Sequence, residues 1–348
     1  MLGVTIDTAV FAPPPIGSVA GDVYRFIETL LHWKDAMDDG AINIYRSKFA
    51  QEVLMRCNLY PMRPQLKQLF SGAGVVEYDA NTVGVWAEKL FSGSIEIEPI
   101  LGINDVLLGN VTVNPDVFAA IAPDELREEC QRCAVILSVA ATFGPEEILR
   151  THAIAVRASD IRNAIAVRAL IEDIEHSRHD LDGLARAPQY FEGSVLACSG
   201  FNDFLLSLDA VAILRAASGS EDIEVAVRLG LYKALSTRGT PRNWSDLPSF
   251  RLGLYFFDSL REHHVMSGSG LANRVMRCVL ETVGHENLAD THALRTGQGG
   301  GNPQRARGKD LAWRRDVDRE YHLHYWECDN GVVELARLVV HNDFSIPE

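Results

Sequence analysis

Two histidines, His322 and His324, stand two residues apart in an aromatic and apolar run near the end of the sequence. Alternate side chains of a β-strand lie on the same face, so a strand here would place both imidazoles together with Glu320. Histidine titrates near neutral pH, which suits it to giving and taking protons. The pattern therefore predicts a cluster able to do acid–base chemistry.

A second β-like run follows Asn330-Gly331, a dipeptide typical of a two-residue hairpin turn. In the resulting register His324 faces Arg337, and directly opposed residues share a face. The polar face is then expected to hold Glu320, His322, His324, Arg337 and His341, while the other face is apolar and buried. A three-residue loop with a bulge would change the cross-strand partners but leave the two histidines together.

Paired histidines beside arginines suit cleavage of a phosphodiester without a metal ion. One imidazole takes a proton, the other gives one, and guanidinium groups stabilise the charge that develops on the phosphate. The predicted catalytic residues are His322, His324, Arg337, His341, Arg319 and Glu320. The same pattern also fits a solvated sheet face, or a set of imidazole and carboxylate ligands for zinc, iron or manganese, and no metal ligand is assigned.

Residues 295–319 carry seven basic and three acidic residues in a chain whose formal net charge is −14. A local basic segment of this kind is a candidate surface for the phosphates of RNA or DNA. The predicted nucleic-acid contacts are Arg295, Arg305, Arg307, Lys309, Arg314 and Arg315. Gly297–Gly301 is expected to be a surface loop, or a flap over a phosphate chain.

Asp7, in an apolar run near the N-terminus, is the one hint of a carboxylate-type metal nuclease. Such a site needs several converging acids, and Asp105, Asp203 and Asp209 are candidates to join it, although the sequence does not bring them together. A polar strand end is the simpler interpretation of Asp7.

The length of 348 residues predicts two domains. A turn-rich polar stretch at 237–249 marks the boundary, which gives a helix-rich α+β domain over 1–240 and a smaller α+β domain over 246–348 built on the antiparallel hairpin. Hydrophobic spacing predicts helices over 20–38, 123–143, 160–176, 202–217, 221–236 and 268–284. The regular strand–helix alternation of a doubly wound sheet is not apparent.

Composition points to a protein of the cytoplasm. The six cysteines, including Cys130 and Cys133 of a lone Cys-x-x-Cys, are interpreted as reduced thiols. No apolar run reaches the 18 or so residues of a membrane span, and the first residues lack the basic and apolar regions of a signal peptide. We expect no cofactor and no membrane partner.

The segment 305–348 resembles the end of RelE/ParE-type toxins, which finish with a basic strand, a turn, an apolar strand and a histidine beside an aromatic residue. Here Tyr321–Tyr325, Asn330-Gly331, Val332–Val340 and His341–Phe344 take those places. The resemblance implies RNA cleavage by a metal-independent cluster, or gyrase inhibition in the other branch of the family. His322 stands where the family has arginine, the chain is acidic, and most of it has no counterpart.

The sequence thus predicts a toxin-type or antiviral-defence nuclease that acts on RNA or DNA through the His/Arg cluster. Two alternatives stay open. One is a non-enzymatic adaptor or scaffold subunit of a larger complex, with the hairpin as its docking surface. The other is a metal-dependent hydrolase.

Overall fold

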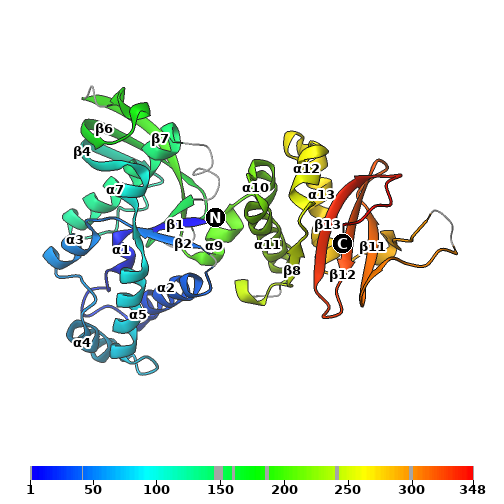
Figure 1. Cartoon of the computed structure of the whole chain (residues 1–348). Coiled ribbons are helices and arrows are strands. Elements are labelled where there is room, and N and C mark those ends of the chain that lie inside the picture. Colours follow the sequence, from blue (N-terminus) through cyan, green and yellow to red (C-terminus); the bar gives the residue numbers. More distant parts are fainter. Residues whose placement is uncertain are drawn as a thin grey trace. The chain divides into compact units, whose positions relative to one another are not determined.

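The computed structural model describes residues 2–40, 42–144, 152–158, 161–184, 188–239, 243–297 and 301–347. The chain divides into two compact units, Met1–Leu208 and Asp209–Glu348 (Figure 1). The boundary between the units lies earlier in the chain than the predicted boundary at 237–249. Helices α10 (Ala210–Ala216) and α11 (Ser220–Thr237) belong to the second unit because they pack on α13 (Ser269–Val283). The predicted α+β class is confirmed, since both units combine helices with a mixed sheet.

Within the described residues, the first unit is built on a seven-stranded sheet with the order β3-β2-β1-β5-β7-β6-β4. The strands are β1 (Gly3–Ile6), β2 (Asn43–Arg46), β3 (Ile95–Glu96), β4 (Ile103–Asn114), β5 (His152–Ala155), β6 (Ala164–His176) and β7 (Gln189–Cys198). The run β3-β2-β1-β5-β7 is parallel, whereas β6 and β4 add an antiparallel extension.

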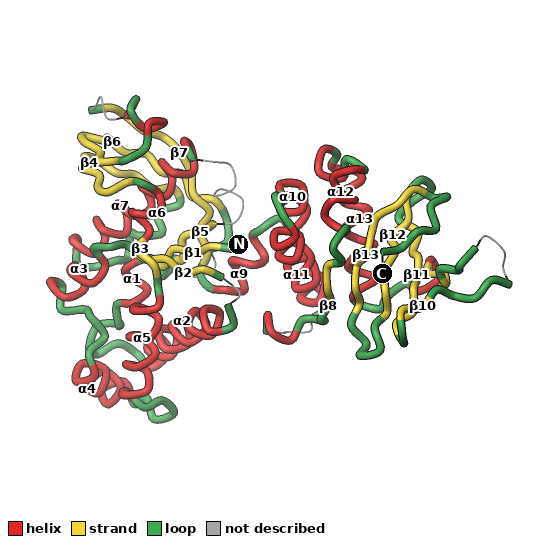
Figure 2. Tube along the Cα trace, in the orientation of Figure 1, coloured by secondary structure: helices red, strands yellow, loops and turns green. Residues whose placement is uncertain are grey.

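Helices connect these strands (Figure 2). They are α1 (Thr8–Phe11), α2 (Ala20–Asp38), α3 (Ala50–Arg56), α4 (Arg63–Ala73), α5 (Ala80–Gly93), α6 (Ile97–Leu101), α7 (Asp124–Phe143), α9 (Phe201–Ser207) and the short 3₁₀ helix His179–Leu181. Helix α7 begins with Asp124 and Glu125, which favour a helix N-terminus. Its apolar side packs on β4, β6 and β7, so α7 is held firmly over the sheet.

Several parallel strands of this unit are short: β1, β2, β3 and β5 have between two and four residues each. Apolar runs at 4–11, 41–46 and 151–157 predict strands, and β1, β2 and β5 overlap these ranges. The predicted helix over 160–176 is wrong, because Ala164–His176 forms β6. Its buried Ile165, Val167 and Ile171 alternate with exposed residues, which is the period of a strand.

Within the described residues, the second unit places helices against a six-stranded sheet of order β10-β11-β12-β13-β8, in which β9 pairs with β11. The strands are β8 (Phe250–Leu252), β9 (Thr291–Ala293), β10 (Ala306–Arg307), β11 (Asp310–Asp316), β12 (Tyr321–Glu327) and β13 (Val333–Val340). Helices α12 (Phe256–Glu262) and α13 contact the sheet, and 3₁₀ helices span Trp244–Asp246, Val265–Ser267 and Leu288–Asp290. The predicted loop Gly297–Gly301 falls largely outside the described residues.

The hairpin of β12 and β13 has the predicted register at the histidines. His322 lies opposite Val339, and His324 lies opposite Arg337. The predicted two-residue turn is wrong, however. Gly331 has a φ of +78° and donates its N–H to the carbonyl of Cys328, so the connecting loop has three residues.

Two irregularities of this hairpin cancel. The three-residue loop displaces the pairs next to the turn by one residue, so that Glu327 faces Val333. A bulge at Ala336 then adds one residue to β13 and restores the pairing further out. The register at the histidines follows from the sum of both.

None of the helices in the described ranges combines the length and apolar character needed to cross a bilayer.

Candidate functional site

The strand order of the first unit reverses between β1 and β5. The chain passes from β1 to β2 and β3 on one side, then returns to β5 and β7 on the other. In open α/β sheets, ligands bind beyond the carboxyl ends of the strands at such a reversal. Asp7 directly follows β1, Ser47 directly follows β2, and Glu98 lies two residues beyond β3. The fold therefore gathers side chains from three distant segments at one edge.

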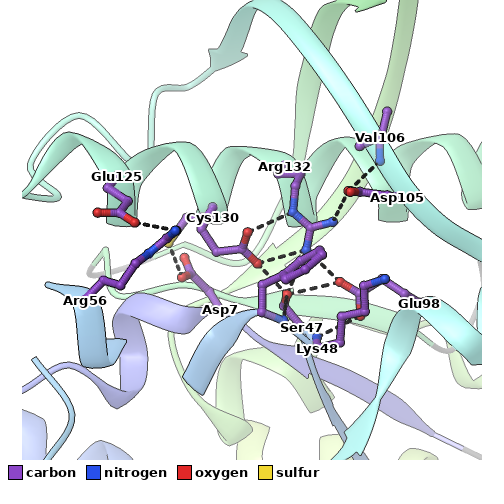
Figure 3. A network of polar contacts seen from close by, with 12 residues as sticks. Asp7, Ser47, Lys48, Arg56, Glu98, Asp105, Val106, Glu125, Cys130 and Arg132 are labelled. Atoms are coloured by element: carbon purple, nitrogen blue, oxygen red, sulfur yellow. Dashed lines mark hydrogen bonds and ion pairs between the residues drawn. The ribbon is translucent and has the colours of Figure 1, made fainter. Parts of the chain in front are cut away.

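Arg132 of α7 reaches this edge and joins its carboxylates (Figure 3). Its Nη2 donates hydrogen bonds to Glu98 Oε1 at 2.7 Å and to Ser47 Oγ at 2.8 Å. Nη2 and Nε also hold the two oxygens of Glu129, at 3.0 and 2.8 Å. The Ser47 hydroxyl contacts both glutamates. We call Asp7, Ser47, Glu98, Glu129 and Arg132 the carboxyl-edge site.

The charged groups of this site are withdrawn from solvent. The side chains of Glu98, Glu129 and Arg132 are 1%, 6% and 12% exposed. Burial opposes the charge on Arg132, but its hydrogen bonds to the two glutamates outweigh burial and raise its pKa. Asp105 lies at the solvent side, 3.6 Å from Arg132 Nη1. The pairing compensates for the desolvation of these ions.

Asp7 adds a fully buried carboxyl to the site. Its Oδ1 accepts hydrogen bonds from the Ala9 N–H at 2.7 Å and from the Cys130 thiol at 2.6 Å, whereas Oδ2 has no hydrogen-bond partner among the described residues. Burial raises the pKa of Asp7 to about 6, and the nearby charge of Glu129 adds to the effect. Asp7 is therefore easily protonated, unlike an ordinary aspartate.

The balance of charge in this site is negative. Among the described residues, Glu98 and Glu129 share the hydrogen bonds of Arg132, whereas the buried Asp7 has no ion pair, and the positive charge that acts on its pKa is that of Arg157. In this arrangement no three Asp, Glu, His or Cys side chains of the described chain form a group that could hold a metal ion. Arg132 Nη2 lies between the two glutamates, so a cation can bind there only if the guanidinium moves.

Sequence reasoning identified part of this site. Asp7 belongs to it and Asp105 lies at its margin, but Asp209 caps α10 in the second unit and Asp203 lies on α9. The glutamates and Arg132 were missed, because no local motif joins residues from β2, β3 and α7. The available signal was the Glu129-x-x-Arg132 pair within a mostly apolar helix.

In the second unit, the sheet face opposite α13 carries the predicted histidines. Arg315 of β11 turns to the helical side, where it pairs with Glu281 of α13, and alternate residues turn away. The rings of His322 and His324 are nearly parallel, with centroids 6.4 Å apart, and that of His341 lies 4.5 Å from His322. The structure thus brings three predicted catalytic residues together.

In each of the two strand histidines, one ring nitrogen has a hydrogen-bond partner and the other has none among the described residues. His322 Nε2 lies 3.1 Å from Asp316 Oδ1, and His324 Nδ1 lies 2.8 Å from the Ser345 carbonyl. Both partners accept hydrogen bonds, so these nitrogens carry the ring protons. His322 Nδ1 and His324 Nε2 remain as acceptors without a partner among the described residues. Burial lowers the pKa of both rings, that of His324 to about 4.

A segment formed by residues 342–347 covers this face. The Ser345 carbonyl bonds His324, and the Pro347 carbonyl accepts from Trp326 Nε1 at 2.9 Å. Ile346 is buried in an apolar cluster with Trp326 and Ala336. His322 and His324 are consequently 1% and 0% exposed. Contact with a substrate requires this segment to lift, and their catalytic roles stay a prediction.

The other predicted catalytic residues lie around the covered face. Arg337 is half-buried, bonds Ser345 and lies 3.5 Å from Glu262. Arg319 and Glu320 are exposed in the turn between β11 and β12, and within the described ranges their side chains make no ring or ion-pair contact with the histidines. The structure therefore brings only some of the predicted catalytic residues together on one face of the hairpin.

The predicted nucleic-acid contacts separate into two groups. Arg307 pairs with Asp310 and Glu334, Lys309 with Asp329, and Arg315 with Glu281. Arg315 is also 1% exposed, so it cannot reach a nucleic acid. By contrast, Arg295, Arg305 and Arg314 have no carboxylate partner in the described part of the chain.

Comparison of the chain with protein families, with characterised proteins and with solved structures found no match. The resemblance of residues 305–348 to RelE/ParE-type toxins stays a prediction. Function is inferred from the geometry of the two units.

Proposed function

We propose that this chain is a divalent-cation-dependent phosphodiesterase that cleaves nucleic acid at the carboxyl-edge site of the first unit. The supporting observation is the buried excess of carboxyls over guanidinium at the reversal of strand order. Buried like charges persist only when they are protonated or neutralised by a cation. Carboxylates at such positions commonly hold the cations used in phosphoryl transfer.

In this proposal, Glu98 and Glu129 would hold a magnesium ion, which would supply positive charge to stabilise the phosphate under attack, and Arg132 would have to move to make room for it. Magnesium usually keeps several waters and binds one or two carboxylates together with substrate phosphate. A preformed cage of three protein ligands is therefore not required. The displaced guanidinium stays on the same edge, where it can pair with the scissile phosphate.

Asp7 is the proposed proton acceptor. The attacking water forms a bond to phosphorus and releases its proton to the Asp7 carboxylate, while the bond from phosphorus to the leaving oxygen breaks and that oxygen takes a proton from solvent. A neighbouring cation favours the ionised form of Asp7, which counteracts the effect of burial on its pKa. Oδ2, which has no hydrogen-bond partner among the described residues, is the oxygen proposed for this step, and because Asp7 is fully buried the surrounding side chains must move to admit the water.

Nucleic acid is proposed as the substrate because of the second unit. Its basic segment leaves Arg295, Arg305 and Arg314 without carboxylate partners among the described residues, and phosphates are the usual partners of such groups.

The test is an oligonucleotide cleavage assay on RNA and DNA, with Mg²⁺, with Mn²⁺ and with EDTA. Glu129→Gln is compared with Glu125→Gln, a matched control one turn earlier on α7, where Glu125 pairs with Arg56. We expect cleavage only with a divalent cation, a loss of at least about 100-fold in Glu129→Gln, and a native rate in the control.

Glu129 also holds Arg132, so the fold of the variant must be checked by circular dichroism and thermal unfolding. Calorimetric titration with Mg²⁺ gives a second measurement that does not depend on turnover, and Glu98→Gln should abolish the binding. Cleavage that survives EDTA, or that proceeds equally in folded Glu129→Gln, would refute the proposal.

A second candidate is the metal-independent cleavage predicted for the hairpin. The bare nitrogens of His322 and His324 favour it, since each can accept a proton. EDTA-resistant cleavage that disappears in His324→Ala would select this candidate over the first.

A further inference from the structure

A pocket of about 420 Å³ lies in the second unit, and its lining includes no residue of the carboxyl-edge site. Its lining residues are Thr291, His292, Ala293, Leu294, Arg295, Gly297, Arg314 and Phe344. The described residues that line it include two arginines and a histidine but no acid, although the chain has 47 acidic residues. The pocket is therefore a local concentration of positive charge in an acidic protein.

Neither arginine is neutralised within the described chain. Arg295 Nη1 donates to the Asn302 carbonyl at 2.5 Å, which positions the guanidinium without removing its charge. Arg314 lies with its guanidinium carbon 5.7 Å from the centre of the Phe344 ring, and its buried Nε has no hydrogen-bond partner among the described residues. A buried donor without an acceptor is costly, so an acceptor supplied by a ligand would be stabilising.

The strand pairing places Arg314 beside two histidines of one face. Arg314 of β11 lies directly opposite His292 of β9 and His324 of β12, so the three side chains share that face. Burial lowers the pKa of the adjacent His322, the carboxylate of Asp316 raises it, and the charges of His341, Arg314 and His292 lower it. Burial also lowers the pKa of His324 to about 4, so the ring opposite Arg314 is uncharged near neutral pH.

We propose that this pocket binds a phosphate ester, with Arg295 and Arg314 on the phosphate oxygens and Phe344 against the attached base or sugar. Planar guanidinium groups match phosphate oxygens with paired hydrogen bonds. A volume of about 420 Å³ exceeds what a phosphate alone fills and suits a ligand the size of a nucleotide. This inference deepens the proposed function, which takes the same arginines as the reason for a nucleic-acid substrate, but it is tested by binding in EDTA and so can fail separately from the proposed cleavage.

A free nucleotide and one nucleotide of a strand share this chemistry. The test therefore measures binding of inorganic phosphate, AMP and a fluorescent eight-nucleotide RNA to the full chain, by calorimetry and fluorescence anisotropy in EDTA. AMP binding as tightly as the RNA assigns the pocket to small ligands, and much tighter RNA binding assigns it to a strand. Either result supports a phosphate-ester site.

Arg314→Gln and Arg295→Gln are compared with Arg261→Gln, which removes the same charge from an exposed residue of α12 outside the pocket. We expect each pocket variant to weaken binding at least about tenfold and the Arg261 control less than about twofold. Arg314→Lys keeps the charge but loses the planar fork, so its affinity should be intermediate.

Thermal unfolding checks that Arg314→Gln is folded, and the half-buried Arg295 provides a second variant on a different segment. Absence of binding by all three probes at millimolar concentration overturns the proposal. Equal weakening in Arg261→Gln also overturns it, because binding would then reflect net charge and not this pocket.

Discussion

Asp7 should make the first unit less stable as the pH rises through the acid range, and Asp7→Asn should remove that dependence. The carboxyl is fully buried, and burial raises its pKa from 3.8 to about 6. Between these two values the unfolded chain releases the proton while the native chain retains it. The stability contributed by the neutral carboxyl is therefore complete below pH 3.8 and is lost as the pH rises to about 6.

The loss is about 3 kcal/mol, because each pKa unit corresponds to about 1.4 kcal/mol. Replacement by asparagine also has a cost that does not vary with pH, since the new amide N–H groups lie where Oδ2 has no partner. The informative quantity is thus the difference between the unfolding free energies of the two proteins. Part of the loss already lies below pH 4, so we expect the variant to gain about 2.4 kcal/mol on the native chain between pH 4 and pH 7.

The assay is urea unfolding from pH 4 to pH 7 in EDTA, read by hydrogen exchange of peptides from β1 and α7 so that the first unit is observed by itself. A difference that stays constant within about 0.5 kcal/mol over this range would show that Asp7 ionises normally in the native state. Mg²⁺ at about 100 times its dissociation constant should then stabilise the native chain at pH 7 by about 2.7 kcal/mol, and Asp7→Asn by less.

Three further predictions concern the second unit. Gly331→Ala should destabilise it by about 1 kcal/mol in urea, because Gly331 has a φ of +78°. Trp326→Phe removes the hydrogen bond to Pro347, so hydrogen exchange of residues 343–346 should accelerate while that of β13 does not. The ring of His324 should titrate near pH 4 in NMR spectra. The stability that the neutral ring contributes is present above pH 6.5 and is lost as the pH falls toward 4. In His324→Gln, the free energy of unfolding should therefore vary less with pH over this range.

The sequence by itself determined the features that depend on near neighbours. Helices α2, α7 and α13 were predicted from apolar spacing, because a helical face repeats within a few residues. The placement of His322 and His324 on one face follows from the alternation of a single strand. Their cross-strand partners are as predicted only because the bulge at Ala336 offsets the longer loop.

Tertiary structure alone decided which groups are accessible and which acids converge. The segment 342–347 folds back over His322 and His324 and is held there by the burial of Ile346. A single buried residue in an irregular segment gives no periodic pattern from which this placement could be predicted. Asp7 and Glu98 lie at the same edge because the carboxyl ends of parallel strands share one edge of a sheet, and the connections between such strands can have any length. No spacing along the chain can therefore encode that encounter.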